Sequence, residues 1–382
     1  MDGRMIYLDY NATTPIASEV AAAMIPYLFG HFGNPSSSHA LGREAKADVD
    51  RARGQVASLV GCSPSEIVFT SGGSESDNMA IKGVAFWKLN RKRRIVTSVI
   101  EHLAVLMPCR YLESMGFDVR YVSVDRQGTV DMEALEREIN EDTLLVTIMH
   151  ANNETGTLQP LHEISAICRK QGALLHTDAS QSVGKVPVSV EALGVDLLTI
   201  AGHKLYAPKG IGALYIRDGI ELEPLIHGAG HEGGRRAGTE NVLLDVALGA
   251  ACALAEKHLQ DANDSLTRYF LHELGARFRD QIILNGHPEK RLPNTLNVSF
   301  LGHDSHDLLR KLSNVAASTG SACHSGQTTI SPVLSAMGVS EQAGRGAIRF
   351  SLGRYTTRDE IDEVLQSLGC IIGDQNKGGE GI

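Results

Sequence analysis

The sequence predicts an α/β protein with a large, mostly parallel sheet covered by helices on both faces, and a smaller α+β domain beside it. Short apolar runs alternate with helix-like patterns from about residue 17 to residue 257, and the runs are almost continuously apolar. After residue 258, polar helix patterns and isolated strand patterns replace this alternation. We therefore expect a large domain over residues 15–257 and a small domain made of residues 1–14 and 258–382.

The individual elements follow from the spacing of apolar residues. Apolar residues step by four and three positions from Ala45 to Leu59, which predicts a helix that ends before Gly61. Strands are expected at residues 67–69, 95–97, 119–122, 144–148, 173–176 and 197–200, with helices among them at 132–139 and 161–170. In the small domain, helices and strands should alternate at residues 265–280, 295–300, 304–312 and 347–351, with a last helix from residue 357.

Composition and charge exclude several classes of protein. Lys and Arg number 36 against 45 Asp and Glu, and the resulting net charge of −9 does not suit nucleic-acid binding. The longest apolar stretch, residues 242–255, is interrupted by Asp245 and is shorter than the roughly 20 residues of a membrane span. Six scattered cysteines form no CxxC pair, so neither a disulfide framework nor a metal site is expected. Without a signal peptide, we expect a cytoplasmic protein with at least one working thiol.

A glycine pair marks the first candidate site. The segment Thr-Ser-Gly-Gly-Ser-Glu-Ser, residues 70–76, directly follows an expected strand and precedes a helix pattern. The backbone at Gly73 can approach an anion closely, and the start of the helix attracts negative charge. Ser74 supplies a hydroxyl donor or serves only as a helix cap. Because the segment matches neither GxGxxG nor GxxxxGK[ST], a phosphate site and an ordinary capped turn both stay open.

Two charged residues follow later strands at the same expected edge of the sheet. Asp178 comes after the run 173–176 and Lys204 after the run 197–200, where ligands gather in open α/β sheets. Burial lowers the pKa of a lysine, which suits an amine nucleophile. Pyridoxal phosphate offers a phosphate, a pyridine nitrogen for a carboxylate and an aldehyde for a lysine, so the three signals together favour this cofactor. The alternative for Asp178 is a helix cap.

Three further residues are candidates for chemistry. His102 follows the strand expected at 95–97, where it could stack on a cofactor ring or transfer a proton near neutral pH. Cys323 lies among small residues, with His324 beside it to favour the thiolate. Arg349 offers a planar fork for a substrate carboxylate, and a structural salt bridge is its alternative role.

Taken together, these motifs resemble the cysteine desulfurases of the class V aminotransferase family, which have the type I pyridoxal-phosphate fold. The resemblance extends over nearly the whole chain and its motifs occur in the family's order. It rests on LDYNATTP (8–15), GNPSS (33–37), FTSGGSES (69–76), NNETG (152–156), HTDASQ (176–181), GHK (202–204), RRAGTEN (235–241), GSAC (320–323) and RFSLGR (349–354).

The resemblance implies roles for individual residues. Lys204 would carry the cofactor as a Schiff base, His102 would stack over its ring, and Asp178 would pair with the pyridine nitrogen. At the ring hydroxyl, the implied contacts are Asn153 and Gln181. At the phosphate, they are Gly73, Ser74 and His203. Thr239 would also reach the phosphate, from the second subunit of a homodimer.

The resemblance also implies a reaction. Arg349 would bind the carboxylate of L-cysteine and the freed Lys204 would take the Cα proton, with His102 assisting. Cys323, on a long mobile loop like that of the housekeeping and nitrogen-fixation enzymes, would accept the sulfur as a persulfide and leave L-alanine. The sulfur would then pass to an acceptor protein such as an iron–sulfur scaffold.

Two positions depart from the pattern of the family. Ala201 stands where many desulfurases have a serine, so one phosphate donor is missing. His324 after Cys323 is reminiscent of selenocysteine lyases, so release of selenide from L-selenocysteine is an alternative reaction. A class V aminotransferase, which needs no loop cysteine, and a catalytically idle binding subunit are further alternatives. An idle subunit has no physical reason to keep the whole set of reactive residues.

Overall fold

The fold is built on a seven-stranded sheet. The computed structural model describes residues 5–87, 91–259, 264–319, 321–324 and 327–377, with the side chains of 321–329 and 374–377 left out of the description. The strand order of the sheet is β2-β8-β7-β6-β5-β3-β4. Its strands are β2 (Ile67–Thr70), β3 (Arg94–Ser98), β4 (Asp118–Val122), β5 (Thr143–Thr147), β6 (Leu174–Asp178), β7 (Leu197–Ala201) and β8 (Gly212–Ile216).

All neighbouring strands of this sheet are parallel except at β8, which is antiparallel to both β7 and β2. The predicted mostly parallel sheet and α/β class are therefore confirmed. Strand β8 was not expected from the sequence. Because β8 reverses direction between two neighbours, β2 runs the same way as β7, and the carboxyl ends of β2, β6 and β7 lie at one edge.

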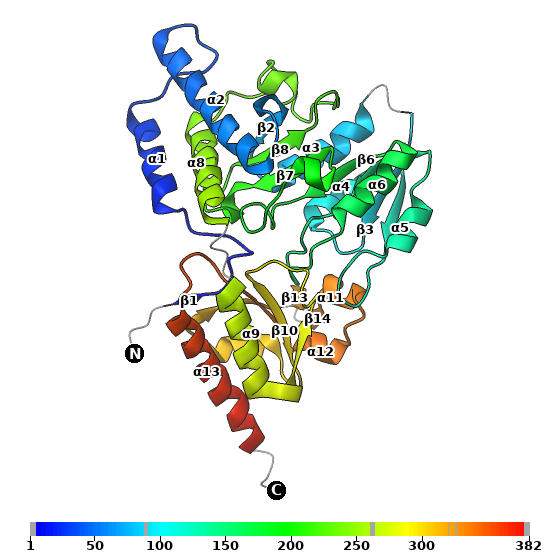
Figure 1. The fold of residues 1–382 in the computed structure, drawn as a ribbon, viewed down its shortest axis with the longest axis vertical. Helices are drawn as coiled ribbons and strands as arrows, with labels where there is room; N and C mark the ends of the chain where they lie inside the picture. The colour runs from blue at the N-terminus through cyan, green and yellow to red at the C-terminus, as the bar shows by residue number, and fades with distance from the viewer. Residues whose placement is uncertain (1–4, 88–90, 260–263, 320, 325–326, 378–382) are drawn as a thin grey trace.

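Helices cover both faces of the large sheet (Figure 1). Side chains alternate between the faces along each strand, so Ile67 and Phe69 enter one apolar cluster while Val68 enters the other. Helices α3 (Gly73–Phe86) and α4 (Leu103–Ser114) cover the Val68 face. The opposite face packs against α1 (Ser18–Phe29), α2 (Ala40–Val60), α5 (Met132–Glu138), α6 (Leu161–Gln171), α7 (Val190–Leu193) and α8 (Val242–His258).

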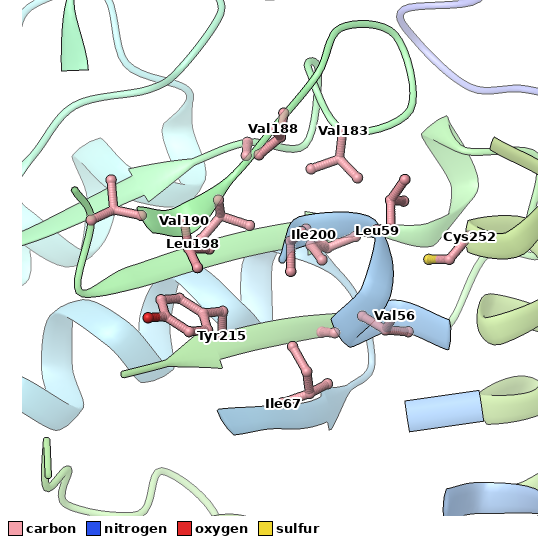
Figure 2. Close-up of a cluster of buried hydrophobic side chains, with 14 of the residues drawn as sticks. Val56, Leu59, Ile67, Val183, Val188, Val190, Leu198, Ile200, Tyr215 and Cys252 are labelled. Atoms are coloured by element: carbon pink, nitrogen blue, oxygen red, sulfur yellow. The ribbon is translucent and has the colours of Figure 1, made fainter. Parts of the chain in front are cut away.

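The larger cluster shows why the strands read as apolar runs. Figure 2 shows Ile67, Leu198 and Tyr215 on the strands and Val56 on the α2 segment that lies over them, all members of one buried cluster. Strands buried on both faces need apolar residues at successive positions. Helix α2 ends at Gly61, whose φ of +73° favours glycine and closes the last turn.

The C-terminal part has a sheet of its own. It contains four antiparallel strands in the order β12-β15-β10-β9. The strands are β9 (Ile282–Asn285), β10 (Thr295–Phe300), β12 (Ser318–Thr319) and β15 (Ala347–Ser351). The accompanying helices are α9 (Asp264–Phe278), α10 (Ser305–Lys311), α11 (Pro332–Ala336), α12 (Glu341–Arg345) and α13 (Arg358–Lys377). The elements expected at residues 265–280, 295–300, 304–312 and 347–351 are thus present.

The N-terminal segment returns to this C-terminal part. Strand β1 (Ile6–Tyr7) pairs in parallel with β11 (Val315–Ala316), and Ile6 and Leu8 are buried in a cluster with Phe270 and Phe350. This arrangement agrees with the expected grouping of residues 1–14 with 258–382, although the exact division of the chain into domains stays a prediction. No helix within the described residues is both long and apolar enough to cross a membrane.

Cys323 was expected on a loop, but the backbone around it is extended. Strand β13 (Ser321–His324) pairs antiparallel with β14 (Gln327–Ile330), and Cys323 stands opposite Thr328 in the register. The side chain of Cys323 lies outside the described residues.

Candidate active site

One pocket lies at the edge where β2, β6 and β7 end. Strand β6 ends at Asp178, and a short turn from Gly202 to Lys204 follows β7. Beyond β2, the glycine pair leads into α3. The pocket brings together six of the residues expected from the sequence: Gly73, Ser74, His102, Asp178, His203 and Lys204.

Lys204 and Asp178 form the charged centre of this pocket. Burial lowers the pKa of the Lys204 amine, the negative charge of Asp178 raises it in part, and Arg349 lowers it again. More of the amine is therefore neutral near pH 7 than in a lysine on the surface. Oδ1 of Asp178 accepts a hydrogen bond from the backbone N–H of Ser180 at 2.9 Å, which orients the carboxylate. An amine with a lowered pKa and an oriented carboxylate can act as base and counter-ion.

The glycine pair forms a tight anion cradle. Gly72 has a φ of +147°, a conformation that L side chains rarely adopt. A Cβ atom on Gly73 would lie only 3.1 Å from Oγ of Ser180 and 3.3 Å from Cβ of Ala201. Because Gly73 begins the 14-residue helix α3, its backbone N–H points out of the helix start, where anions are favoured. The geometry of this segment therefore fits a phosphate-binding site better than an ordinary capped turn.

His102 combines a structural and a chemical role. As the N-cap of α4, it accepts a hydrogen bond at Nδ1 from the backbone N–H of Ala104 at 3.1 Å. Burial lowers the pKa of the imidazole, Asp178 raises it and Lys204 lowers it. A neutral ring whose Nδ1 accepts a hydrogen bond carries its proton on Nε2. His102 can therefore hold or donate a proton at Nε2.

His203 lies beside the cradle with its position fixed from the N-terminal segment. Its Nδ1 is 3.1 Å from Oγ1 of Thr13, and its carbonyl accepts hydrogen bonds from the backbone and hydroxyl of Thr14. Burial lowers the pKa of His203 to about 4, with smaller contributions from Lys204 and Lys209. A neutral His203 can donate only one ring N–H to a bound anion.

Two pocket residues were missed from the sequence. Asp77 is buried in α3, and its Oδ1 lies 3.6 Å from Nε2 of His176. Burial, followed by the charge of Asp178, raises the pKa of Asp77 well above its usual value. Ser180 lines the pocket, and its hydroxyl oxygen lies 3.1 Å from the point where a Cβ on Gly73 would stand. The available signals were that Asp77 shares one helical face with Ala80 and Ile81, at i+3 and i+4, and that a hydroxyl stands two positions after Asp178.

Gln181, Asn153 and Arg349 do not line this pocket; they belong to an adjoining hydrogen-bond network. Nε2 of Gln181 donates to the carbonyl of Asn11 at 2.9 Å. Nη1 of Arg349 donates to the carbonyl of Asn153 at 2.9 Å, while its Nη2 contacts Asp9 at 2.7 Å. The salt bridge considered for Arg349 is therefore present. Its Nε is buried without a hydrogen-bond partner among the described residues.

Thr239 does not reach the pocket within its own chain. It is exposed and lines a neighbouring cavity with Ser71 and Arg236. This location is compatible with the expected contribution to the site of a second subunit.

Pyridoxal phosphate requires a site for its phosphate, an anion near its ring nitrogen and an amine for its aldehyde. The tight cradle at Gly73, the buried carboxylate of Asp178 and the low-pKa amine of Lys204 meet these needs in one pocket. Fold and site therefore define a pyridoxal-phosphate-dependent enzyme. The model of the family described as aminotransferase class V matches residues 6–364, and the chain belongs to that family.

Individual relatives are similar over almost the full length. The chain is 48% identical to a protein named cysteine desulfurase IscS from Dictyoglomus turgidum, over 97% of this chain and 95% of the relative. Its structure matches a solved NifS-like protein with a TM-score of 0.90 at 41% identity, covering 97% of this chain and 99% of the other. A second solved structure, of SspA in complex with cysteine, has a TM-score of 0.82 at 40% identity, covering 92% and 100%.

Proposed function

We infer that this enzyme is a cysteine desulfurase, which uses pyridoxal phosphate to remove sulfur from L-cysteine and leaves L-alanine. The observation that carries this conclusion is the meeting of Lys204, Asp178 and the Gly73 cradle in one pocket. The near-full-length similarity to a chain named cysteine desulfurase and to a structure holding cysteine supports the choice of substrate.

Each residue has a defined task in the proposed reaction. When bound, the cofactor supplies an electron sink for the bonds at Cα of the amino acid. Arg349 holds the substrate carboxylate, and the amine of Lys204, whose pKa burial lowers, takes the Cα proton. The thiolate of Cys323 attacks the substrate sulfur, so that an S–S bond forms and the carbon–sulfur bond breaks. The electron pair of that bond stays on carbon, which takes a proton and becomes the methyl group of alanine.

Replacement of Cys323 tests the nucleophile. We expect Cys323→Ala to bring sulfide release from L-cysteine, in the presence of dithiothreitol, down to background. The matched control is Cys370→Ala, because Cys370 is an exposed thiol on α13. Sulfide release by Cys323→Ala at the wild-type rate would refute the assignment of the nucleophile.

Selenocysteine lyase is the second candidate activity. The run Ala-Cys-His-Ser at residues 322–325 and the missing hydroxyl at Ala201 favour it. Selenide is the better leaving group, so a lyase should need Cys323 less. Turnover of L-selenocysteine and L-cysteine, each with and without Cys323, separates the two: selenide release that survives Cys323→Ala favours the lyase.

A homodimer would complete the site with Thr239 of a second copy. The exposure of Thr239 and its place in the neighbouring cavity support a role in trans. Mixing Lys204→Ala with Thr239→Val subunits should then restore part of the activity, since one hybrid site is intact. No recovery after subunit exchange would show that Thr239 does not serve the site of the second subunit, and full activity of Thr239→Val alone would place it outside the site. The persulfide sulfur then passes to an acceptor protein. The five cysteines with described side chains are all free thiols. Free thiols are typical of a reducing compartment, which supports a cytoplasmic location.

A further inference from the structure

Helix α4 carries an exposed apolar stripe. Leu103, Met107, Tyr111 and Met115 have exposed fractions of 61%, 52%, 47% and 54%. They follow one another at intervals of four residues, on α4 and at its C-cap, so they form one continuous ridge along the helix. Four large apolar side chains in a row exceed the single exposed residues that are normal on a protein surface.

The stripe is not needed to hold α4 in place. The opposite side of the helix buries Val105, Cys109 and Leu112 in the core beneath, where α4 packs beside α3 (Figure 1). The position of the helix is therefore fixed by these buried residues. An exposed ridge on a helix that is already anchored is available to a partner.

Positive charge surrounds the stripe. Nζ of Lys82 lies 4.6 Å from the centre of the Tyr111 ring, and Arg110 is exposed on α4 itself. At the C-terminal end, Arg93 stacks on Phe117 at 4.6 Å. The acidic residue of α4, Glu113, lies three residues after Arg110 on the same flank of the helix, where both side chains act on Tyr121: burial and then the charge of Glu113 raise the pKa of Tyr121 to about 12, and Arg110 lowers it in part. This cationic rim contrasts with the net charge of −9 of the whole chain.

We propose that the α4 stripe is the docking site for an acidic amphipathic helix of a partner protein. Ridges at four-residue intervals are the surfaces that interlock when two helices pack. From Leu103 to Met115 the stripe is about 18 Å long, which matches about three helical turns. Acidic residues flanking the apolar face of the partner would meet Lys82, Arg93 and Arg110.

A second copy of the chain fits the stripe less well. In a two-fold contact the same patch faces itself, so the cationic rim would oppose its own copy. The helix begins directly after His102, so a docked partner would sit at the mouth of the active-site pocket. That consequence rests on the proposed function, whereas the docking itself does not.

Binding of designed peptides to the purified holoenzyme tests the docking site. The probe is a fluorescein-labelled helical peptide of 14 residues with leucines on one face and glutamates elsewhere; its counterparts are a scrambled peptide and one with lysines in place of the glutamates. We expect the acidic peptide to bind at least 10-fold more tightly than either counterpart. The double variant Met107→Glu/Met115→Glu should lose at least 10-fold in affinity. Arg110→Glu should weaken the acidic peptide and strengthen the basic one.

The control variant is Ile283→Glu, because Ile283 is 45% exposed on β9, far from α4 in the chain. It should bind the acidic peptide as the wild type does. Sulfide release with dithiothreitol should stay unchanged in every variant, which separates a lost docking site from a failed fold or a wrong assignment of activity. Equal binding of the scrambled peptide would overturn the proposal. So would a fall in molecular mass of the double variant by light scattering, since the stripe would then be a subunit interface.

Discussion

Lys185 holds the amide of Gln181 in a single orientation. The Lys185 amine donates hydrogen bonds to Oε1 of Gln181 at 3.0 Å and to Oδ1 of Asn11 at 2.9 Å. Because Oε1 of Gln181 accepts from the lysine, its Nε2 is left to donate on the other side, where it contacts the Asn11 carbonyl. Burial lowers the pKa of Lys185 well below its usual value, and Lys204 and Arg349 add to the effect. Lys185 thus links the N-terminal segment to the edge of the cofactor site.

We therefore expect Lys185→Met to weaken cofactor binding. The variant leaves Oε1 of Gln181 without its lysine donor, whereas Oδ1 of Asn11 keeps the hydrogen bond from Asn294 at 3.2 Å. An unsatisfied buried oxygen costs about 1–3 kcal/mol, so we expect a loss on the order of 10-fold in cofactor affinity. Titration of the apoenzyme with pyridoxal phosphate, followed by visible absorbance, measures it. Lys46→Met is the control, because Lys46 is exposed and, among the described residues, forms ion pairs with the carboxylates of Asp50 and Glu240 alone. Unchanged affinity in Lys185→Met would show that Gln181 needs no positioning.

The ion pair between Arg349 and Asp9 leads to a prediction about substrate binding. Nη2 of Arg349 is held by Asp9 and by the hydroxyl of Ser318, so the fork of the side chain is fixed before substrate arrives. Arg349→Lys keeps the charge and loses the fork, so KM for L-cysteine should rise about 10-fold or more with a smaller change in kcat. Steady-state kinetics measure both constants. Arg310→Lys on the exposed face of α10 should leave them unchanged, and an unchanged KM in Arg349→Lys would contradict the assignment.

Ala201 offers a gain-of-function test at the phosphate cradle. Its Cβ faces the backbone of Gly73, so Ala201→Ser would bring a hydroxyl to the anion site. One added hydrogen bond to a charged group is worth roughly 1.5 kcal/mol, which corresponds to about 10-fold tighter binding of pyridoxal phosphate. The converse variant, Ser180→Ala, should weaken binding. Equilibrium dialysis of the cofactor measures both, and a weaker affinity in Ala201→Ser would show that the hydroxyl crowds the cradle instead.

Stability at acid pH depends on buried neutral histidines. Burial lowers the pKa of His150 to about 4, and its Nδ1 lies 2.9 Å from Oγ of Ser182. Below about pH 6.5 the unfolded chain binds a proton that the folded chain refuses until about pH 4. The contribution of neutral His150 to the free energy of unfolding is therefore complete above pH 6.5 and is lost as the pH falls toward 4. Burial raises the pKa values of Glu101 and Asp245 to about 8. These two carboxyl groups therefore stabilise the folded protein at low pH and lose that contribution as the pH rises toward 8.

Because these groups offset one another, the difference between a variant and the wild type is the informative quantity. We expect the stability of His150→Gln relative to wild type to improve by about 2 kcal/mol between pH 7 and pH 5, at about 1.4 kcal/mol per pH unit below pH 6.5. Urea unfolding at the two pH values measures this. A constant difference would mean that His150 is charged in the folded protein or does not titrate in the unfolded one.

The fold was largely predictable because strands buried on two faces require apolar residues at every position. The runs around Ile95, Leu145 and Leu198 each became a strand of the large sheet. Strand β8 escaped prediction, since its Gly-Ala start at residues 212–213 resembles a loop. Glycine is needed there because a Cβ on Gly212 would lie 2.7 Å from Cα of Gly72.

The sequence by itself determined the strand-end motifs, and with them the cofactor class and six residues of one pocket, because the ends of parallel strands meet at one edge wherever the intervening chain runs. Only the tertiary structure decided which polar residues share a buried volume. It brought Asp77 under the pocket and Lys185 against Gln181, from separate segments of the chain. It also left the α4 ridge uncovered, since apolar spacing predicts a helix face without saying which of its sides the core will bury.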